Sequence, residues 1–183
     1  MEGSQKPSLL LATMGTLQRF LTWIPLGYIF ETSLIPQLVK FFEVPAYRTI
    51  TLDCLTEIAS LPSDDIPETY RPTVHQMFVA LITQLAAMIP HSVDLTGLYA
   101  GGSDADRLFV ERLALFLGTF FRSYFHFFEA TDGTILLQDA VLEGMSLLLR
   151  ISNVGDEDVF KVCRAMLIFS VPVKGRIYRY DKS

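Results

Sequence analysis

The sequence predicts an all-α fold in which antiparallel helical hairpins stack in a line as an α-α superhelix. Three helical segments fill the stretch 21–61 and are separated only by prolines and two- or three-residue corners. The apolar residues in this stretch are too dense for a single amphipathic stripe, so its helices should pack against neighbours on more than one side. No alternating strand pattern lies between the helices of the chain.

Composition fits a folded domain that binds neither nucleic acid nor membrane. Half of the 183 residues are hydrophobic and 12% are aromatic, which excludes a disordered chain. The net charge is −5, and the 15 basic residues are scattered instead of clustered as a phosphate-binding surface requires. The two cysteines, Cys54 and Cys163, lie far apart in helical patterns, so we expect small buried side chains and no disulfide framework.

Residues 72–93 contain no Asp, Glu, Lys or Arg, which is a length that could cross a bilayer. Prolines, histidines and glutamines interrupt the segment, and its dense apolar part, 77–89, is shorter than the roughly 18 residues that a span requires. We therefore expect a buried helix here. The first eight residues also lack the basic and apolar regions of a secretory signal.

The first helices are bounded by prolines. Pro7 and Ser8 begin a helix that ends at Pro25, and at most a short helical turn follows over 26–31. Thr32 or Ser33 can cap a second helix that runs to about Glu43, with Pro36 in its first turn, where the missing amide donor does no harm. The apolar residues of the first helix recur every three or four positions: Leu10, Met14, Leu17 and Leu21.

Two further helices follow. Pro45 begins the third helix, whose apolar stripe ends at Leu61, and the residues 62–67 read as a loop. The fourth helix is predicted from about Pro67 to Ile89. Its apolar stripe has the spacing of one helical face: Val74, Phe78, Leu81, Leu85 and Met88.

The second half of the chain repeats the pattern. Residues 90–103 are expected to be irregular, and Ser103 or Asp104 should cap a fifth helix that runs to about Glu129. A turn at 131–133 leads into a sixth helix, and a seventh begins near Asp156.

The first members of the hairpins start near Ser8, Pro45, Asp104 and Asp156, and this spacing of about 40 to 60 residues fits HEAT-type helical pairs with enlarged loops. A closed helical bundle is the structural alternative. A bundle would bring the first and last helices together, whereas a solenoid keeps them apart.

Four segments of the chain are distinctive: LQRFLTWIPLGYIFETSLI, FFEVPAYRTITLDCLTEIASL, LYAGGSDADRLFVERLALFLGTFF and ISNVGDEDVFKVC. They resemble the exportin-1 family of nuclear export receptors, within the importin-β superfamily. The resemblance extends from about Pro7 to Cys163. We interpret residues 1–163 as a HEAT-repeat segment of about three helical pairs and the first helix of a fourth. Residues 164–183 depart from the family pattern and form a divergent tail, in which Pro172 and Gly175 interrupt any helix.

The resemblance implies transport and not catalysis. Such receptors carry cargo proteins with a leucine-rich export signal together with Ran-GTP, contact nucleoporins and shuttle between nucleus and cytoplasm through the nuclear pore. It also implies that the signal-binding groove lies outside this segment, which is therefore expected to be a scaffold. No cofactor is expected.

One polar stripe on the predicted sixth helix is a candidate contact for Ran or cargo, because in HEAT solenoids the second helix of each pair lines the concave side. It consists of Asp139, Glu143, Ser146 and Arg150.

No other pattern indicates a catalytic or metal site. His75, His91 and His126 lack the ligand spacing of a metal centre. The run Gly101-Gly102-Ser103 before a helix could cradle a phosphate, but it has no P-loop lysine and follows no strand, so we interpret it as a loop.

Two other functional outcomes stay open. The aromatic run 120–128 allows an alternative function, a helical bundle that binds a lipid or another apolar ligand. The segment could also have no activity of its own and associate with itself through exposed apolar ends.

Overall fold

Nine α-helices and three short 3₁₀ turns make up the described part of the chain, residues 7–129 and 135–169 of the computed structural model. No strand occurs within these residues, which confirms the all-α prediction. The α-helices are α1 (Pro7–Phe20), α2 (Leu26–Phe30), α3 (Leu34–Phe42), α4 (Arg48–Ala59), α5 (Arg71–Met88), α6 (Leu95–Gly101), α7 (Asp104–Glu129), α8 (Ile135–Ile151) and α9 (Glu157–Phe169). The 3₁₀ turns are η1 (Pro45–Tyr47), η2 (Ser63–Asp65) and η3 (Glu68–Tyr70).

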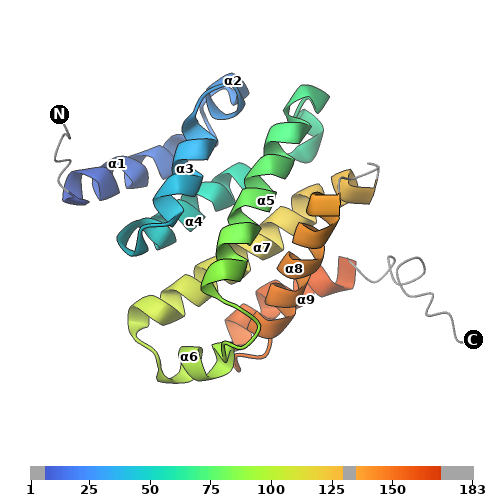
Figure 1. The fold of residues 1–183 in the computed structure, drawn as a ribbon. Helices are drawn as coiled ribbons and strands as arrows, with labels where there is room; N and C mark the ends of the chain where they lie inside the picture. Colours follow the sequence, from blue (N-terminus) through green and yellow to red (C-terminus); the bar gives the residue numbers. More distant parts are fainter. Residues whose placement is uncertain (1–6, 130–134, 170–183) are drawn as a thin grey trace, which may run out of the picture.

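The long helices form two layers (Figure 1). In one layer α1 packs against α4, α4 against α7, and α7 against α9. In the other layer α3 packs against α5, and α5 against α8. Successive hairpins therefore place their first helices side by side and their second helices side by side, which is the arrangement of a helical-repeat solenoid.

The two end helices distinguish a solenoid from a closed bundle. In Figure 1, α1 and α9 lie at opposite ends of the row of helices, with α4 and α7 between them. Each helix packs mainly against its neighbours in the chain of hairpins. The solenoid prediction is therefore confirmed, and the bundle alternative is wrong for the described residues.

The stretch 90–103, expected to be irregular, contains the short helix α6. Gly97, Gly101 and Gly102 lowered the helical expectation for this segment, because glycine disfavours a helix interior by about 1 kcal/mol relative to alanine. Packing compensates here: α6 contacts both α7 and α8, and Leu95 is buried at its start. The expectation was wrong because local propensity does not include this tertiary contact.

The dense apolar stretch at the first hairpin is less enclosed than expected. Trp23, after α1, is 83% exposed, and Tyr28 on α2 is 66% exposed. Other apolar side chains of the same stretch are buried, such as Ile29 and Phe42. Apolar density indicates that a helix has a face to bury, but it does not say on which side a neighbour lies.

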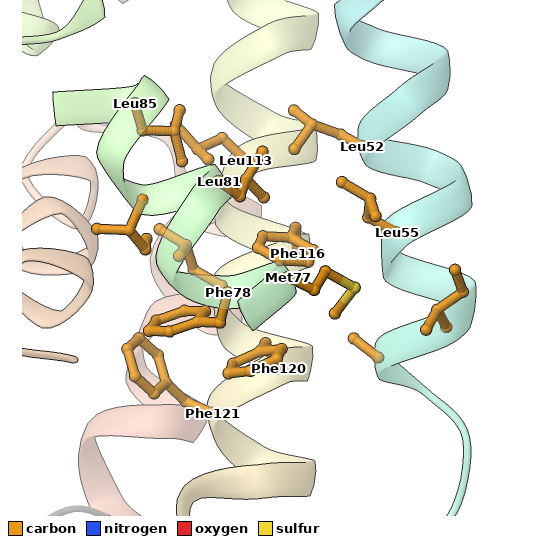
Figure 2. Packing of buried hydrophobic residues seen from close by; sticks show 14 of the residues in the cluster. Leu52, Leu55, Met77, Phe78, Leu81, Leu85, Leu113, Phe116, Phe120 and Phe121 are labelled. Carbon is orange, nitrogen blue, oxygen red and sulfur yellow. The ribbon is translucent and has the colours of Figure 1, made fainter. Parts of the chain in front are cut away.

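Aromatic rings from α5 and α7 form the centre of the core (Figure 2). Phe78 and Phe120 stack with ring centroids 4.3 Å apart and an interplanar angle of 5°. Phe121 meets Phe78 edge to face at 5.5 Å. Phe116, Phe120, Phe121 and Tyr124 are fully buried among these contacts. The part of the aromatic run that suggested a lipid ligand is thus occupied by ring-to-ring packing, and Phe127 and Phe128 lie outside the described side chains.

Tyr124 joins α7 to the end of α4. Its buried hydroxyl lies 3.2 Å from the carbonyl oxygen of Ile58 and 3.4 Å from that of Leu61, so it can donate a hydrogen bond to the last turn of α4. The last carbonyls of a helix have no partner within the helix itself. Burial also raises the pKa of Tyr124, which keeps the hydroxyl protonated and able to donate.

Gly144 allows α8 to approach the aromatic core closely. A Cβ atom at this position would lie 3.1 Å from the Cζ atoms of both Phe78 and Phe121, and 3.2 Å from Cδ1 of Ile82. Gly15 on α1 is also in a helix interior, but a Cβ atom there would meet nothing within 4 Å. The two glycines therefore form a matched pair for testing the packing.

The substitution Gly144→Ala is expected to lower the free energy of unfolding by about 1 to 2 kcal/mol. Overpacking costs about 1 to 3 kcal/mol, and the better helix propensity of alanine offsets up to about 1 kcal/mol of that loss. Gly15→Ala has the propensity gain without the clash and should stabilise the chain by up to about 1 kcal/mol. Urea unfolding followed by circular dichroism measures both; stabilisation by both substitutions would contradict the close packing of α8.

Candidate partner-binding surface

Helix α8 carries the polar stripe predicted from the sequence. Spacings of four, three and four residues place its members on one side of a helix. The opposite side is buried against the other helices through residues such as Leu137, Gly144 and Leu148. The structure thus brings all four predicted residues to the side of α8 away from the core: Asp139, Glu143, Ser146 and Arg150.

Arg150 and Glu143 connect α8 to the end of α5. The Arg150 guanidinium donates hydrogen bonds to the carbonyl oxygens of Ile89 at 3.2 Å, Pro90 at 3.1 Å and Val93 at 2.8 Å. Glu143 Oε2 lies 3.1 Å from Nε2 of His91. These carbonyls follow the last turn of α5, where backbone acceptors lack helical partners, so Arg150 acts as a side-chain cap.

Asp139 and Ser146 differ from the other two members of the stripe. Asp139 is exposed and Ser146 is half-buried. The candidate surface is therefore divided: Glu143 and Arg150 hold α8 against α5, while Asp139 and Ser146 face outward beside them. The spacing in sequence could not show this division, because the residues that receive the hydrogen bonds lie about 60 positions earlier in the chain.

Three apolar residues beside the polar stripe were not predicted as part of any surface. Ile135, Leu142 and Leu149 are 76%, 55% and 48% exposed. Their spacing of seven residues places them along one line of the helix. That spacing was present in the sequence and could have revealed an apolar stripe adjacent to the polar one; we call it the α8 apolar stripe.

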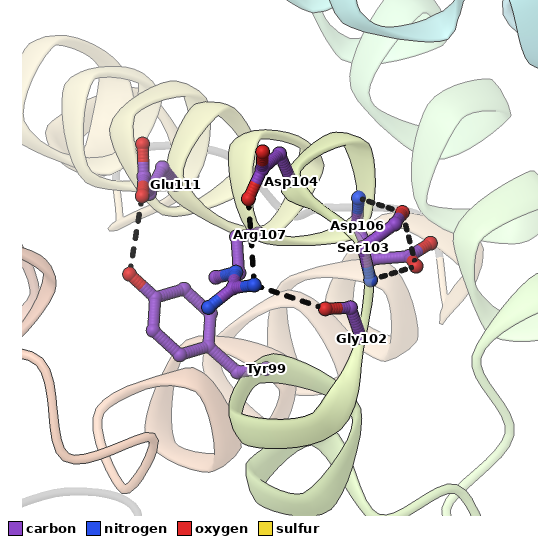
Figure 3. Close-up of polar contacts among 7 residues, drawn as sticks. All are labelled: Tyr99, Gly102, Ser103, Asp104, Asp106, Arg107 and Glu111. Atoms are coloured by element: carbon purple, nitrogen blue, oxygen red, sulfur yellow. Dashed lines mark hydrogen bonds and ion pairs between the residues drawn. The ribbon is translucent and has the colours of Figure 1, made fainter.

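The segment between α6 and α7, considered above as a phosphate cradle, is occupied by its own side chains (Figure 3). The Ser103 amide donates to Oδ2 of Asp106 at 2.9 Å, and the Asp106 amide donates to Oγ of Ser103 at 3.2 Å. This reciprocal pair is a capping box at the start of α7. The Ser103 hydroxyl and amide hold the pKa of Asp106 below its usual value, so a carboxylate already fills the position that an anion would take.

Tyr99 connects α6 to α7 and α9. Its hydroxyl lies 3.1 Å from Oε1 of Glu111, and Asp156 also hydrogen-bonds to it. Burial, together with these two carboxylates, raises the pKa of Tyr99 to about 12. Asp156 additionally accepts hydrogen bonds from the amides of Asp158 at 2.9 Å and Val159 at 3.0 Å, which caps α9. The cluster is explained by helix capping and by docking of α6.

Both cysteines are buried and poorly suited to reaction. Burial raises the pKa of Cys54 to about 12 and that of Cys163 to about 11, so neither thiol is ionised near neutral pH. Among the residues that the structure describes, no group of three potential ligands could hold a metal ion. None of the described helices has both the length and the apolar character needed to cross a bilayer.

Comparison with known proteins identifies relatives over most of the chain. The family described as "Exportin 1-like protein" matches residues 1–55. The chain is 40% identical over 163 residues to "Protein EXPORTIN 1A" of Arabidopsis thaliana. It is 42% identical over 164 residues to exportin-1 of Schizosaccharomyces pombe and 37% identical over 164 residues to exportin-1 of Drosophila melanogaster.

These matches cover 89% of the chain but only 15% of the length of each relative. The comparison therefore confirms the resemblance noted in the sequence. The chain corresponds to a short segment of these relatives.

Replacing Arg150 should weaken the attachment of α8 to α5. Arg150→Met keeps much of the aliphatic length but removes the hydrogen bonds to three carbonyls, and we expect a loss of about 2 kcal/mol in the free energy of unfolding. Arg150→Lys keeps the charge but not the planar guanidinium. Its free energy of unfolding should lie between those of Arg150→Met and the parent. Asp139→Asn is the exposed control and should change stability by less than about 0.5 kcal/mol. Equal stability of Arg150→Met and the parent in urea unfolding would contradict the capping role.

Proposed function

We propose that this chain, which is 40 to 42% identical to exportin-1 proteins over 163 to 164 residues, serves as a HEAT-type scaffold segment of a nuclear export receptor. In this proposal the complete receptor carries cargo with a leucine-rich export signal, together with Ran-GTP, through the nuclear pore and contacts nucleoporins on the way. The segment itself contributes curvature and surface, while the signal-binding groove lies elsewhere in the receptor.

The observation that carries the proposal is the sequence identity of about 40% over 89% of the chain, on a fold made of stacked hairpins. A solenoid presents an extended surface formed by one helix from each pair, which suits the enclosure of another macromolecule. Shuttling between nucleus and cytoplasm follows as a proposal from the same relationship.

Charge on the layer formed by α3, α5 and α8 is concentrated at few positions. Helix α5 has a single charged residue, Arg71, at its start. Lys40 on α3 and Asp139 on α8 are exposed. An exposed charge on a surface with few others can steer and orient a charged partner, so Asp139 is the strongest of the four α8 candidates, with Ser146 beside it.

A segment exchange tests the scaffold proposal. The matching 164-residue segment of Schizosaccharomyces pombe exportin-1 is replaced by the aligned residues of this chain, and Ran-GTP-dependent binding of an export-signal peptide is measured. A scaffold with the same helical geometry should keep the peptide affinity within about tenfold of the parent receptor, which is about 1.4 kcal/mol. Loss of peptide binding in a chimera whose helical content and melting temperature match the parent would contradict the proposal.

Charge reversal tests the contact on α8. In the same chimera, Asp139→Lys is expected to weaken Ran-GTP binding by roughly three- to tenfold at low salt, with a smaller difference at high salt because exposed charges are screened. Asp64→Lys makes the same change of charge at an exposed residue of the turn η2, outside α8, and is the matched control. Glu143→Lys also removes the contact with His91, so His91→Gln is its control. Equal affinities of Asp139→Lys and Asp64→Lys would remove Asp139 from the contact surface.

A further inference from the structure

Helix α6 and the residues beside it, 90–102, are held differently from the long helices. Leu95 is the only buried residue among these thirteen, whereas α5 and α8 each bury six residues. A helix of seven residues is also too short to be stable by itself in water. The position of α6 therefore depends on the contacts that neighbouring helices make with this segment.

Side chains of α8 hold one side of the segment. Arg150 donates hydrogen bonds to three carbonyl oxygens of residues 89–93, and Glu143 Oε2 lies 3.1 Å from Nε2 of His91. The Thr96 hydroxyl donates to a backbone carbonyl oxygen just after α8, at 3.3 Å. Each of these contacts is polar, so water can replace it when the segment moves away.

Side chains of α7 and α9 hold the other side. The Tyr99 hydroxyl lies 3.1 Å from Oε1 of Glu111 on α7 (Figure 3) and also bonds to Asp156, which caps α9. Arg107, in the first turn of α7, donates to the carbonyl oxygen of Gly102 at 3.2 Å (Figure 3). Both contacts are again polar, so hydrogen bonds on two sides and one buried leucine keep the segment in place.

The neighbouring helices pack together without this segment. Helix α4 packs directly on α7, and α5 packs directly on α8. Ser103 and Asp106 cap the start of α7 with their own side chains. Segments that bury few apolar side chains open locally, at a lower free energy than global unfolding. Opening of residues 90–102 therefore leaves the aromatic core packed and α7 capped.

The closed segment occupies half of the polar stripe on α8. Glu143 and Arg150 contact residues 89–93, whereas Asp139 is exposed and Ser146 is half-buried beside them. Opening removes the carbonyl oxygens from the Arg150 guanidinium and the imidazole from Glu143. Both side chains can then contact another molecule, and a guanidinium is well suited to carboxylate and phosphate groups.

We propose that residues 90–102 form a latch, the α6 latch, which opens as a unit while the flanking hairpins stay folded. The closed latch withholds Arg150 and Glu143 from other molecules, so it competes with a partner for the same two side chains. The opening does not depend on the proposed transport function; only the use of the freed side chains in binding a partner rests on it.

Hydrogen exchange of the full chain in increasing urea tests the opening. Relative to their intrinsic rates, the amides of α6 should exchange at least about tenfold faster than the central amides of α5 and α7. Their rates should change little with urea because a local opening exposes little surface, whereas the rates in α5 and α7 should rise steeply. Equal protection and equal urea dependence in the three helices would overturn the proposal.

Tyr99→Phe tests whether the latch and Arg150 are released together, because the Tyr99 hydroxyl bonds on the side of α7 and α9. Loss of the hydroxyl should raise exchange in α6 roughly three- to tenfold. Labelling of Arg150 by phenylglyoxal, measured by mass spectrometry, should rise by the same factor. Tyr28→Phe, at a tyrosine of α2 that is 66% exposed, is the matched control and should change neither rate. The exposed Arg19 of α1 is the internal reference for the reagent.

Faster exchange in α6 with unchanged labelling of Arg150 would show that the opening does not release this side chain, and the proposal would then be wrong.

Gly144→Ala distinguishes the latch from a general loss of stability. It should raise the exchange of central amides in α5 and α7, because a Cβ atom at this position would press against Phe78 and Phe121. Exchange in α6 and labelling of Arg150 should stay within about twofold of the parent, because the added methyl group meets no residue of the latch. A parallel rise in α6 and in the core would show that α6 opens only with the whole chain.

Discussion

The contact between α5 and α7 is the interaction on which the rest of the solenoid depends. Phe78 of α5 and Phe120 of α7 stack with ring centroids 4.3 Å apart, Phe121 of α7 meets Phe78 edge to face, and Gly144 lets α8 approach the same cluster. Helix α7 packs in turn against α4, α6, α8 and α9, so it touches both layers. Each hairpin of a repeat array contacts only its neighbours, and a central helix of this kind transmits order from one pair to the next.

Polar contacts add to this core at the ends of the helices. Tyr124 donates to the last carbonyls of α4, Arg150 to those that follow α5, and Asp156 accepts from the first amides of α9. Each contact satisfies backbone groups that a helix cannot pair internally. Aromatic packing holds the layers together, whereas these end contacts determine how one hairpin is placed against the next.

The order of helices was predictable from the sequence because it depends on local chemistry. Prolines at positions 7 and 36 stand in first turns, Ser103 caps α7 and Asp156 caps α9, and apolar residues at helical spacing indicate the buried faces. What the sequence did not reveal depends on neighbours distant in the chain. Helix α6 is stabilised by contact with α7 and α8, and Trp23 is exposed because no described helix covers it. The division of the α8 stripe depends on carbonyls near residue 90.

Helix α8 carries its packing residues, its capping residues and its exposed residues on distinct sides, a division that no pattern in its sequence suggested. One side carries Gly144 and meets the aromatic core, the edge with Glu143 and Arg150 is held against α5, and the remaining surface presents Asp139, Ser146 and three apolar side chains to the outside. Because these sets are distinct, substitutions on the outer surface can change a contact without unfolding the pair. Surface positions away from packing and capping usually alter stability by less than about 0.5 kcal/mol. The scaffold proposed above has to hold its shape while it meets other chains, and the separation of these residue sets on α8 fits that requirement.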